Sequence, residues 1–229
     1  MTGKTHRVGG MLCVLGGYSL LESKGMLLGN VSPLLQLAVM YPFAIYGSVA
    51  SDLDHDWHSC PSKDVVSLAI NKVLHLTSGI VERLNEKSTA YKILSIFDAN
   101  HRSWQTHSDL TLLAMIMVMT NLMNNSVNSV DSVIIRLIFT GLILGVISHL
   151  VLDMLTPEGI WSFITIAIRK VTKNKLFPEK ISLVPDTKFF RTGGVWEKLV
   201  RKILWVLCLL LFLKMILDIS PYSLSFLRG

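Results

Sequence analysis

The sequence predicts an all-α protein: a polytopic membrane helical bundle with amphipathic helices at its inner face. Of its 229 residues, 51% are hydrophobic and only 17% are charged, and the mean hydropathy is +0.50. Soluble domains carry about 25% charged residues, so this composition indicates a membrane protein. Several apolar stretches approach the roughly 20 residues that cross a bilayer as a helix, and strand-like alternation is lacking. We expect one membrane-embedded domain over residues 1–229.

The first apolar stretch, residues 8–22, follows a charged start and contains Gly9, Gly10, Gly16 and Gly17. These glycines are typical either of a tightly packed membrane helix or of a buried, partly inserted one, and both interpretations stay open. A signal peptide also combines a charged start with an apolar run, but no small-residue cleavage site follows here. We therefore expect a retained helix.

Four further stretches, residues 32–50, 110–123, 133–153 and 203–219, complete a prediction of five membrane spans. With the chain starting inside, only Lys24, Arg136, Lys214 and Arg228 of the 22 Lys and Arg residues lie away from the inner side. Basic residues collect on the cytoplasmic side of membrane proteins. The segments 51–108 and 154–202 are therefore predicted to be cytoplasmic.

Residues 62–97 are mixed in polarity, and apolar residues recur there at intervals of three and four: Val66, Ile70, Val73, Leu76, Ile80 and Leu84. This spacing is that of amphipathic helices. We expect them either to pack over the inner ends of the spans or to lie in the membrane interface.

The formal net charge of +6 does not indicate a nucleic-acid partner, because the basic residues flank apolar stretches and form no aromatic-rich basic module. The membrane lipid bilayer is the predicted partner. The three cysteines are odd in number and far apart, so they predict neither a disulfide framework nor a structural zinc site.

Ionisable residues converge on the inner side of this topology, although they are scattered along the chain. His149 and Asp153 are four residues apart near the end of the fourth span, hence on one helical face. An Asp at the centre of a membrane costs about 2.5 to 3.5 kcal/mol on insertion scales, so such residues normally have a partner or a function. This spacing is consistent with two interpretations: His149 and Asp153 form an ion pair, or they ligate one metal ion together.

Other polar segments lie on the same predicted side. Asp52 and Asp54 belong to a run of carboxylates whose mutual repulsion a bound cation would relieve, with a solvated acidic turn as the alternative. Imidazoles can ligate zinc and a guanidinium can bind an anion, and these groups occur together before the third span, in His101, Arg102 and His107. His6 precedes the first helix.

Together these motifs resemble the YdjM family of membrane-bound proteins assigned as metal-dependent hydrolases. The resemblance extends over most of the chain through the following motifs: His6, Asp52-Leu53-Asp54-His55, His101-Arg102, Thr106-His107-Ser108, His149-Leu150-Val151-Leu152-Asp153, Thr156-Pro157-Glu158-Gly159, Phe190-Arg191-Thr192-Gly193-Gly194 and Glu197. It implies a multi-pass α-helical protein of a bacterial inner or cytoplasmic membrane with metal-dependent hydrolase activity.

We predict a divalent metal centre, with zinc favoured, whose ligands are His6, Asp52, Asp54, His101, His107, His149 and Asp153. Asp54, Arg102 and His107 are the predicted catalytic residues. A catalytic zinc commonly has about three protein ligands, so this set is consistent with one ion or two. The predicted substrate is a phosphoester or lipid-linked molecule at the cytoplasmic face.

Two other functions compete with hydrolysis. A non-catalytic membrane adaptor would use a structural metal to staple the inner helix ends, with no open position for water. A transporter would explain polar residues inside the membrane, but the sequence has neither paired broken helices nor two similar halves, so it ranks last.

Overall fold

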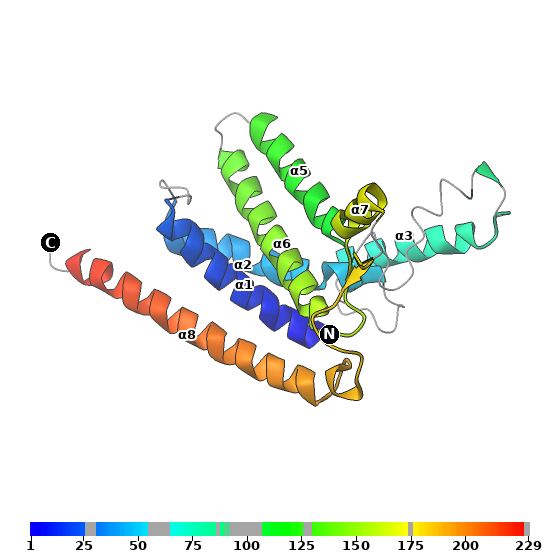
Figure 1. Ribbon diagram of the computed structural model, residues 1–229. Helices are drawn as coiled ribbons and strands as arrows, with labels where there is room; N and C mark the ends of the chain where they lie inside the picture. The colour runs from blue at the N-terminus through cyan, green and yellow to red at the C-terminus, as the bar shows by residue number, and fades with distance from the viewer. Residues whose placement is uncertain are drawn as a thin grey trace.

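The computed structural model describes residues 1–25, 31–54, 65–85, 88–89, 91, 107–125, 130–173 and 176–226. The helices are α1 (Gly3–Ser23), α2 (Pro33–Ala50), α3 (Val65–Val81), α5 (Asp109–Asn125), α6 (Val130–Met154), α7 (Phe163–Thr172) and α8 (Val195–Phe226). The 3-10 turns η1 (Ser51–Asp54) and η3 (Lys188–Phe190) and the antiparallel strands β1 (Ile160–Trp161) and β2 (Lys180–Ile181) complete these elements. The all-α prediction is confirmed (Figure 1).

The direction of the long helices alternates along the chain. The helices α1, α5 and α8 begin at one end of the bundle, and α2 and α6 end there (Figure 1). We call this end of the bundle the polar end. Segments far apart in the sequence meet at it: Thr2 contacts Glu197, and His149 contacts Ser48.

Glycines allow α2 and α6 to pack backbone to backbone. A Cβ added to Gly141 would overlap the carbonyl oxygen of Met40, and one added to Gly145 would overlap that of Ala44. Small residues at such contacts are the usual device by which membrane helices approach closely. The matching order of these contacts shows that α2 and α6 run in the same direction.

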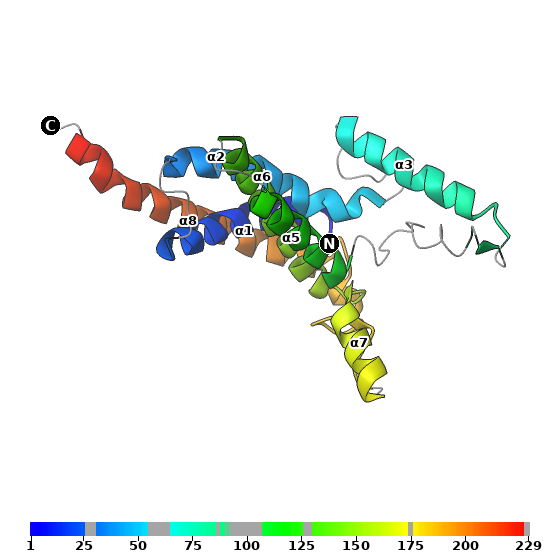
Figure 2. The same cartoon turned by 90° about the horizontal axis from the view of Figure 1, so that it is seen from above.

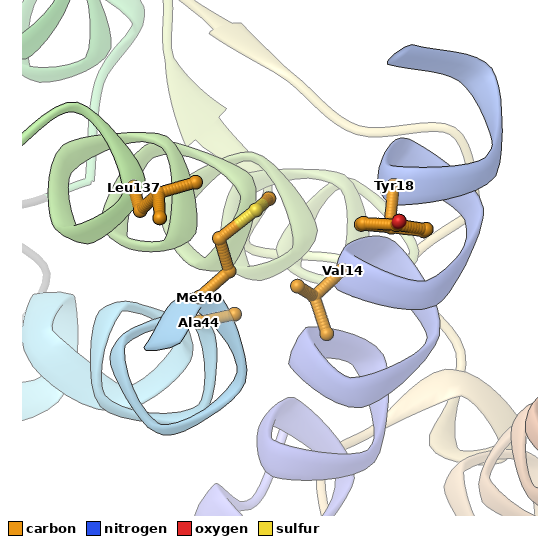
Figure 3. Packing of buried hydrophobic residues seen from close by; sticks show 5 residues of the cluster. All are labelled: Val14, Tyr18, Met40, Ala44 and Leu137. Carbon is orange, nitrogen blue, oxygen red and sulfur yellow. The ribbon is translucent and has the colours of Figure 1, made fainter. Parts of the chain in front are cut away.

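The helix α1 packs antiparallel across both of these helices. Its side chains Val14 and Tyr18 meet Met40 and Ala44 of α2 and Leu137 of α6 in a buried cluster (Figure 3). Inside a bilayer the lipid is as apolar as these side chains, so close packing, not the hydrophobic effect, stabilises such a contact. The glycine-rich first segment is thus a packed helix in this structure.

Among the described residues, two segments are long and apolar enough to cross a membrane, Pro33–Leu53 and Val133–Met154. They coincide with the predicted spans 32–50 and 133–153. The predicted span 110–123 falls in a shorter apolar helix, Asp109–Leu122. The remaining predicted spans lie within α1 and α8 and stay predictions. Large apolar side chains are nevertheless exposed along α8, as lipid contact would require: Ile203, Trp205, Val206, Leu209, Leu210, Phe212, Leu213, Ile216 and Leu217.

Helix α3 exposes apolar side chains and buries polar ones. The side chains of Val73, Leu76 and Ile80 are exposed, whereas those of Ser67 and Asn71 are buried. Asn71 Nδ2 donates a hydrogen bond of 2.6 Å to the Leu53 carbonyl oxygen and so ties α3 to η1. The contact with η1 is what packing over the inner end of a span would require, and the exposed apolar stripe is what a position in the membrane interface would require, so both alternatives stay predictions.

A small irregular region follows α6. Helix α6 ends at Met154, just before the Thr156-Pro157-Glu158-Gly159 motif, and the two strands β1 and β2, which were not predicted, flank α7. Gly159 has φ +60°, and a Cβ there would overlap the Ile181 carbonyl oxygen, so the turn into β1 requires glycine. Figure 2 shows α3 and α7 extending away from the bundle at its polar end.

Candidate metal centre

Five of the predicted ligands meet at the polar end of the bundle. His6 comes from the first turns of α1, Asp52 from η1, His107 from the segment just before α5, and His149 and Asp153 from the last turns of α6. Their exposed fractions are 6% for Asp52 and at most 1% for the other four. Two carboxylates and three imidazoles are therefore withdrawn from solvent together.

Four donor atoms form a compact set, which we call the four-donor set: Asp52 Oδ1, His107 Nε2, His149 Nε2 and Asp153 Oδ2. Each imidazole nitrogen lies near both carboxylate oxygens. His107 is 3.4 Å from Asp52 and 3.5 Å from Asp153, and the corresponding distances from His149 are 3.8 and 3.3 Å. Two ligands about 2.1 Å from a tetrahedral ion are about 3.4 Å apart, so each of these imidazole–carboxylate separations is compatible with two ligands of one metal.

His6 faces the other oxygen of each carboxylate. Its Nε2 lies 3.4 Å from Asp153 Oδ1 and 3.9 Å from Asp52 Oδ2, and it also contacts the Met1 carbonyl oxygen at 3.1 Å. The His6 ring stacks on that of His149, with centroids 3.9 Å apart. Ligand-capable atoms of His6, His149 and Asp153 all lie within 4.8 Å of one another, as do those of Asp52, His107 and His149. His149 belongs to both groups.

The orientation of His149 suits a ligand. Its Nδ1 lies 2.8 Å from the Ser48 carbonyl oxygen, which can only accept, so Nδ1 carries a proton and the Nε2 of the neutral imidazole presents its lone pair. Among the described residues, the buried Nε2 makes no hydrogen bond. A ligating histidine typically donates its second ring N–H to a carbonyl or carboxylate in this way. The residues present thus fit a divalent ion.

The charge of the site leads to the same conclusion. The carboxylates of Asp52 and Asp153 lie beside imidazoles, and Asp153 Oδ1 also accepts from the Met1 nitrogen at 2.8 Å. Buried carboxylates are costly unless a cation or hydrogen bonds compensate them. A divalent cation in the four-donor set would compensate the oxygen of each carboxylate that faces it.

Backbone contacts with Trp161 hold His107 in place. Its carbonyl oxygen accepts from the Trp161 N–H at 2.9 Å, and Ser108 forms a bridge with Trp161. Next to them, Asp109 caps the start of α7, accepting from Ser162 Oγ at 2.9 Å and Phe163 N at 2.8 Å. The segment after α6 thereby fixes the residue that precedes α5.

Glu197 ties the start of α8 to the start of α1, immediately beside His6. Its Oε1 accepts from Thr2 N at 2.8 Å, from Thr5 Oγ1 at 2.5 Å and from Thr2 Oγ1, and its Oε2 accepts from Gly193 N at 2.6 Å. Burial raises the pKa of this carboxyl, but the hydrogen bonds from Thr2 and Thr5 outweigh it and lower the pKa to about 2. Glu197 is therefore an anion held inside the fold.

The structure does not test every predicted ligand. Asp54 lies in η1, but its side chain is outside the described part of the chain, as are His101 and Arg102 altogether. The sequence analysis missed the roles of Asp109 and Glu197. Glu197 was noted only as part of the family resemblance. Neither residue stands in a sequence pattern with the distant residues that it contacts, Ser162 for Asp109 and Thr2 for Glu197, which are more than 50 residues away along the chain.

The comparisons with known proteins agree with this description. Curated proteins and solved structures gave no match. The model of the YdjM inner membrane protein family matches residues 1–220, which is nearly the whole chain. This family description, together with the two apolar helices, assigns the protein to a cell membrane. The chain belongs to the YdjM inner membrane protein family.

Proposed function

We propose that this protein is a membrane-bound, metal-dependent hydrolase that acts on a phosphoester or lipid-linked substrate at the cytoplasmic face. One observation carries the proposal: five buried histidines and aspartates from four separate segments converge at metal-ligand distances. Such a cluster is costly to bury and needs a compensating function.

The chain's own residues would divide the work as follows. Asp52, His107, His149 and Asp153 hold the ion, which when bound supplies the Lewis acidity that activates water for hydrolysis at neutral pH. Ser48 fixes the tautomer of His149 through its carbonyl oxygen. Asp54 and Arg102, with His107, remain the proposed catalytic residues, and Arg102 would hold the negative charge of a phosphoester.

The geometry bears on the number and kind of ions. Because His149 Nδ1 is engaged by Ser48, only Nε2 can ligate, and the two three-residue groups cannot each bind a separate ion through it. We therefore propose one ion in the four-donor set, zinc or manganese, with His6 oriented toward the outer oxygens of the two carboxylates. A second ion would need ligands beyond these five.

The four-donor set also favours the adaptor as a second candidate. Four protein ligands complete a tetrahedral zinc and leave no position for water, which is the mark of a structural site. An ion of higher coordination number, such as octahedral manganese, would keep positions for water and substrate. Metal identity and hydrolytic activity together separate the two functions.

The first experiment measures metal in the detergent-purified protein by elemental mass spectrometry. We expect stoichiometric metal in the wild type, its loss in a His149→Ala/Asp153→Ala variant, and its retention in His75→Ala, where the substituted histidine lies on α3. Hydrolysis of phosphodiester and phospholipid substrates that disappears with the metal would support catalysis. Tightly held zinc without hydrolysis would support the adaptor, and absence of metal from the wild type after reconstitution would refute both.

We also propose a multi-pass topology of five spans with the metal centre on the cytoplasmic side. The alternating helix directions support it, because α1, α5 and α8 leave the polar end and α2 and α6 return to it. Single cysteines placed at the exposed positions Asp186 and Ser23 should react with a membrane-impermeant thiol reagent from opposite sides of inverted and right-side-out vesicles. Labelling of both from the same side would contradict the proposed topology.

A further inference from the structure

The parallel helices α1 and α8 form a seam that starts at the polar end. A pocket of about 470 Å³ opens there between the two helix starts. Four of its lining side chains are cationic, and we call it the basic pocket: Lys4, Arg7, Lys198 and Arg201. The Glu197 carboxylate also lines it, but hydrogen bonds from Thr2, Thr5 and Gly193 hold both of its oxygens. The ionised side chains lining the pocket therefore carry a net charge of three positive units.

The backbone adds to this positive potential. Both α1 and α8 begin at the basic pocket, so the positive ends of two helix dipoles face it. N–H groups at a helix start commonly receive a phosphate or another anion. The four cationic side chains and the two helix starts thus select the same kind of ligand.

An apolar groove of about 650 Å³ continues along the same two helices and is closed on its far side by the first half of α2. Its walls include Met11 and Leu15 of α1, Trp205, Leu209 and Phe212 of α8, and Ala38 of α2. The lining is almost entirely apolar. The groove suits a hydrocarbon chain and offers almost nothing to a polar ligand.

Helical spacing places the basic pocket and the apolar groove on one side of the seam. Along α1 the lining residues include 4, 7, 11 and 15, and along α8 they include 198, 201, 205, 209 and 212. Steps of three and four residues keep side chains on one helix face, and four residues advance about 6 Å along the axis. A single ligand can therefore occupy the basic pocket with its head and the groove with its tail.

We propose that the α1–α8 seam binds one anionic phospholipid, with its phosphate in the basic pocket and an acyl chain in the apolar groove. A membrane protein meets this ligand at high concentration, and the order of charge and apolar surface along the seam matches a lipid entering from the cytoplasmic leaflet. The inference goes beyond the proposed hydrolase, because lipid binding at the seam requires neither metal nor catalysis.

Native mass spectrometry of the full-length protein in detergent tests this site. The protein is titrated with phosphatidylglycerol and with phosphatidylcholine of the same acyl chains. We expect retained phosphatidylglycerol, and a loss of affinity of about tenfold or more in Lys198→Gln/Arg201→Gln, since each basic residue near an anionic surface contributes appreciably to attraction. The matched control is Lys170→Gln/Lys202→Gln, which removes the same charge from exposed positions outside the pocket and should bind like the wild type.

Two further arms separate the lipid from other ligands. Ala38→Trp, at an exposed position of the groove, should weaken phosphatidylglycerol binding without changing charge. Glycerol 3-phosphate carries the phosphate without chains and should bind at least tenfold more weakly. If glycerol 3-phosphate bound as tightly as phosphatidylglycerol, the ligand of the seam would be a soluble phosphate compound and not a lipid. If the pocket variant and the control variant lost the same affinity for phosphatidylglycerol, the binding would reflect general surface charge and not the seam.

The lipid site and the proposed hydrolase can fail independently. The His149→Ala/Asp153→Ala protein should still bind phosphatidylglycerol, provided that its circular dichroism matches the wild type. Loss of binding in that folded variant would overturn a seam site that is independent of the metal centre. Unchanged binding in folded Lys198→Gln/Arg201→Gln protein would overturn the seam site itself.

Discussion

His149 Nδ1 of α6 donates a hydrogen bond of 2.8 Å to the carbonyl oxygen of Ser48 in α2. This hydrogen bond joins two helices that pack backbone to backbone, and it leaves Nε2 facing the carboxylates of Asp52 and Asp153. The orientation of the His149 ring thus depends on the contact between α2 and α6. A substitution that disturbs this helix contact should also weaken metal binding.

The four-donor set predicts unequal roles for the histidines. His149→Ala and His107→Ala each remove a member of the set and should lower zinc or manganese affinity by at least tenfold more than His6→Ala, because His6 faces the outer carboxylate oxygens. Competition with a fluorescent chelator measures the affinities. Loss of metal in His6→Ala as severe as in His149→Ala, with His107→Ala unaffected, would move the ion to the group of His6, His149 and Asp153.

Metal removal should destabilise the folded protein. A ligand that binds only the native state adds about 2.7 kcal/mol when its free concentration is 100 times its Kd. We expect chelation to lower the Tm in detergent, re-addition of the ion to restore it, and His149→Ala/Asp153→Ala to be insensitive to both. A wild-type Tm that chelator leaves unchanged, despite verified metal loss, would contradict this expectation.

The close approach of α2 and α6 predicts a position-dependent effect of adding one methyl group. Gly145→Ala brings a Cβ against the Ala44 carbonyl oxygen and should destabilise the protein by about 1–3 kcal/mol, the range of overpacked cores. Gly79→Ala is the matched control, because a Cβ on Gly79 in α3 meets nothing within 4 Å. Thermal unfolding in detergent compares them, and equal Tm shifts would contradict the packing argument.

The pKa of Glu197 predicts a pH dependence of stability. The folded value of about 2 lies below the ordinary value of 4.5, so the ionised carboxylate stabilises the fold fully above pH 4.5. That contribution is lost as pH falls from about 4.5 toward 2, where the folded state also becomes protonated. Glu197→Gln should flatten the fall of Tm in this window, whereas Glu179→Gln, which removes an exposed partner of Arg169, should not. Parallel Tm profiles for wild type and Glu197→Gln would disprove this role.

The sequence carried much of the information about the metal centre. The four-residue spacing of His149 and Asp153 is enough to place them on one face of a helix, and the distribution of basic residues predicts that distant segments lie on one membrane side. The structure adds the donor atoms and their separations. These depend on the crossing of α1, α2 and α6, which local periodicity does not encode.

Other features left no local signal. The bonds of Glu197 to Thr2 and Thr5 span more than 190 residues, and the cap of Asp109 on α7 spans more than 50. The apolar period of α3 predicted a helix correctly, but periodicity alone could not decide between protein and membrane as the neighbour of Val73, Leu76 and Ile80. The residues that contact these side chains in the folded protein lie far away along the sequence. A helical pattern, which covers only a few turns, therefore does not identify them.

The parallel course of α2 and α6 has an electrostatic consequence. Each helix carries about half an elementary negative charge at its C-terminal end, and both of these ends lie at the metal centre. These two helix ends add negative potential to that of the carboxylates, and they oppose the positive starts of α1 and α5, which bring His6 and His107 to the same place. Of the described helix ends, only starts meet at the basic pocket, those of α1 and α8, so its backbone potential is positive where that of the metal centre is mixed.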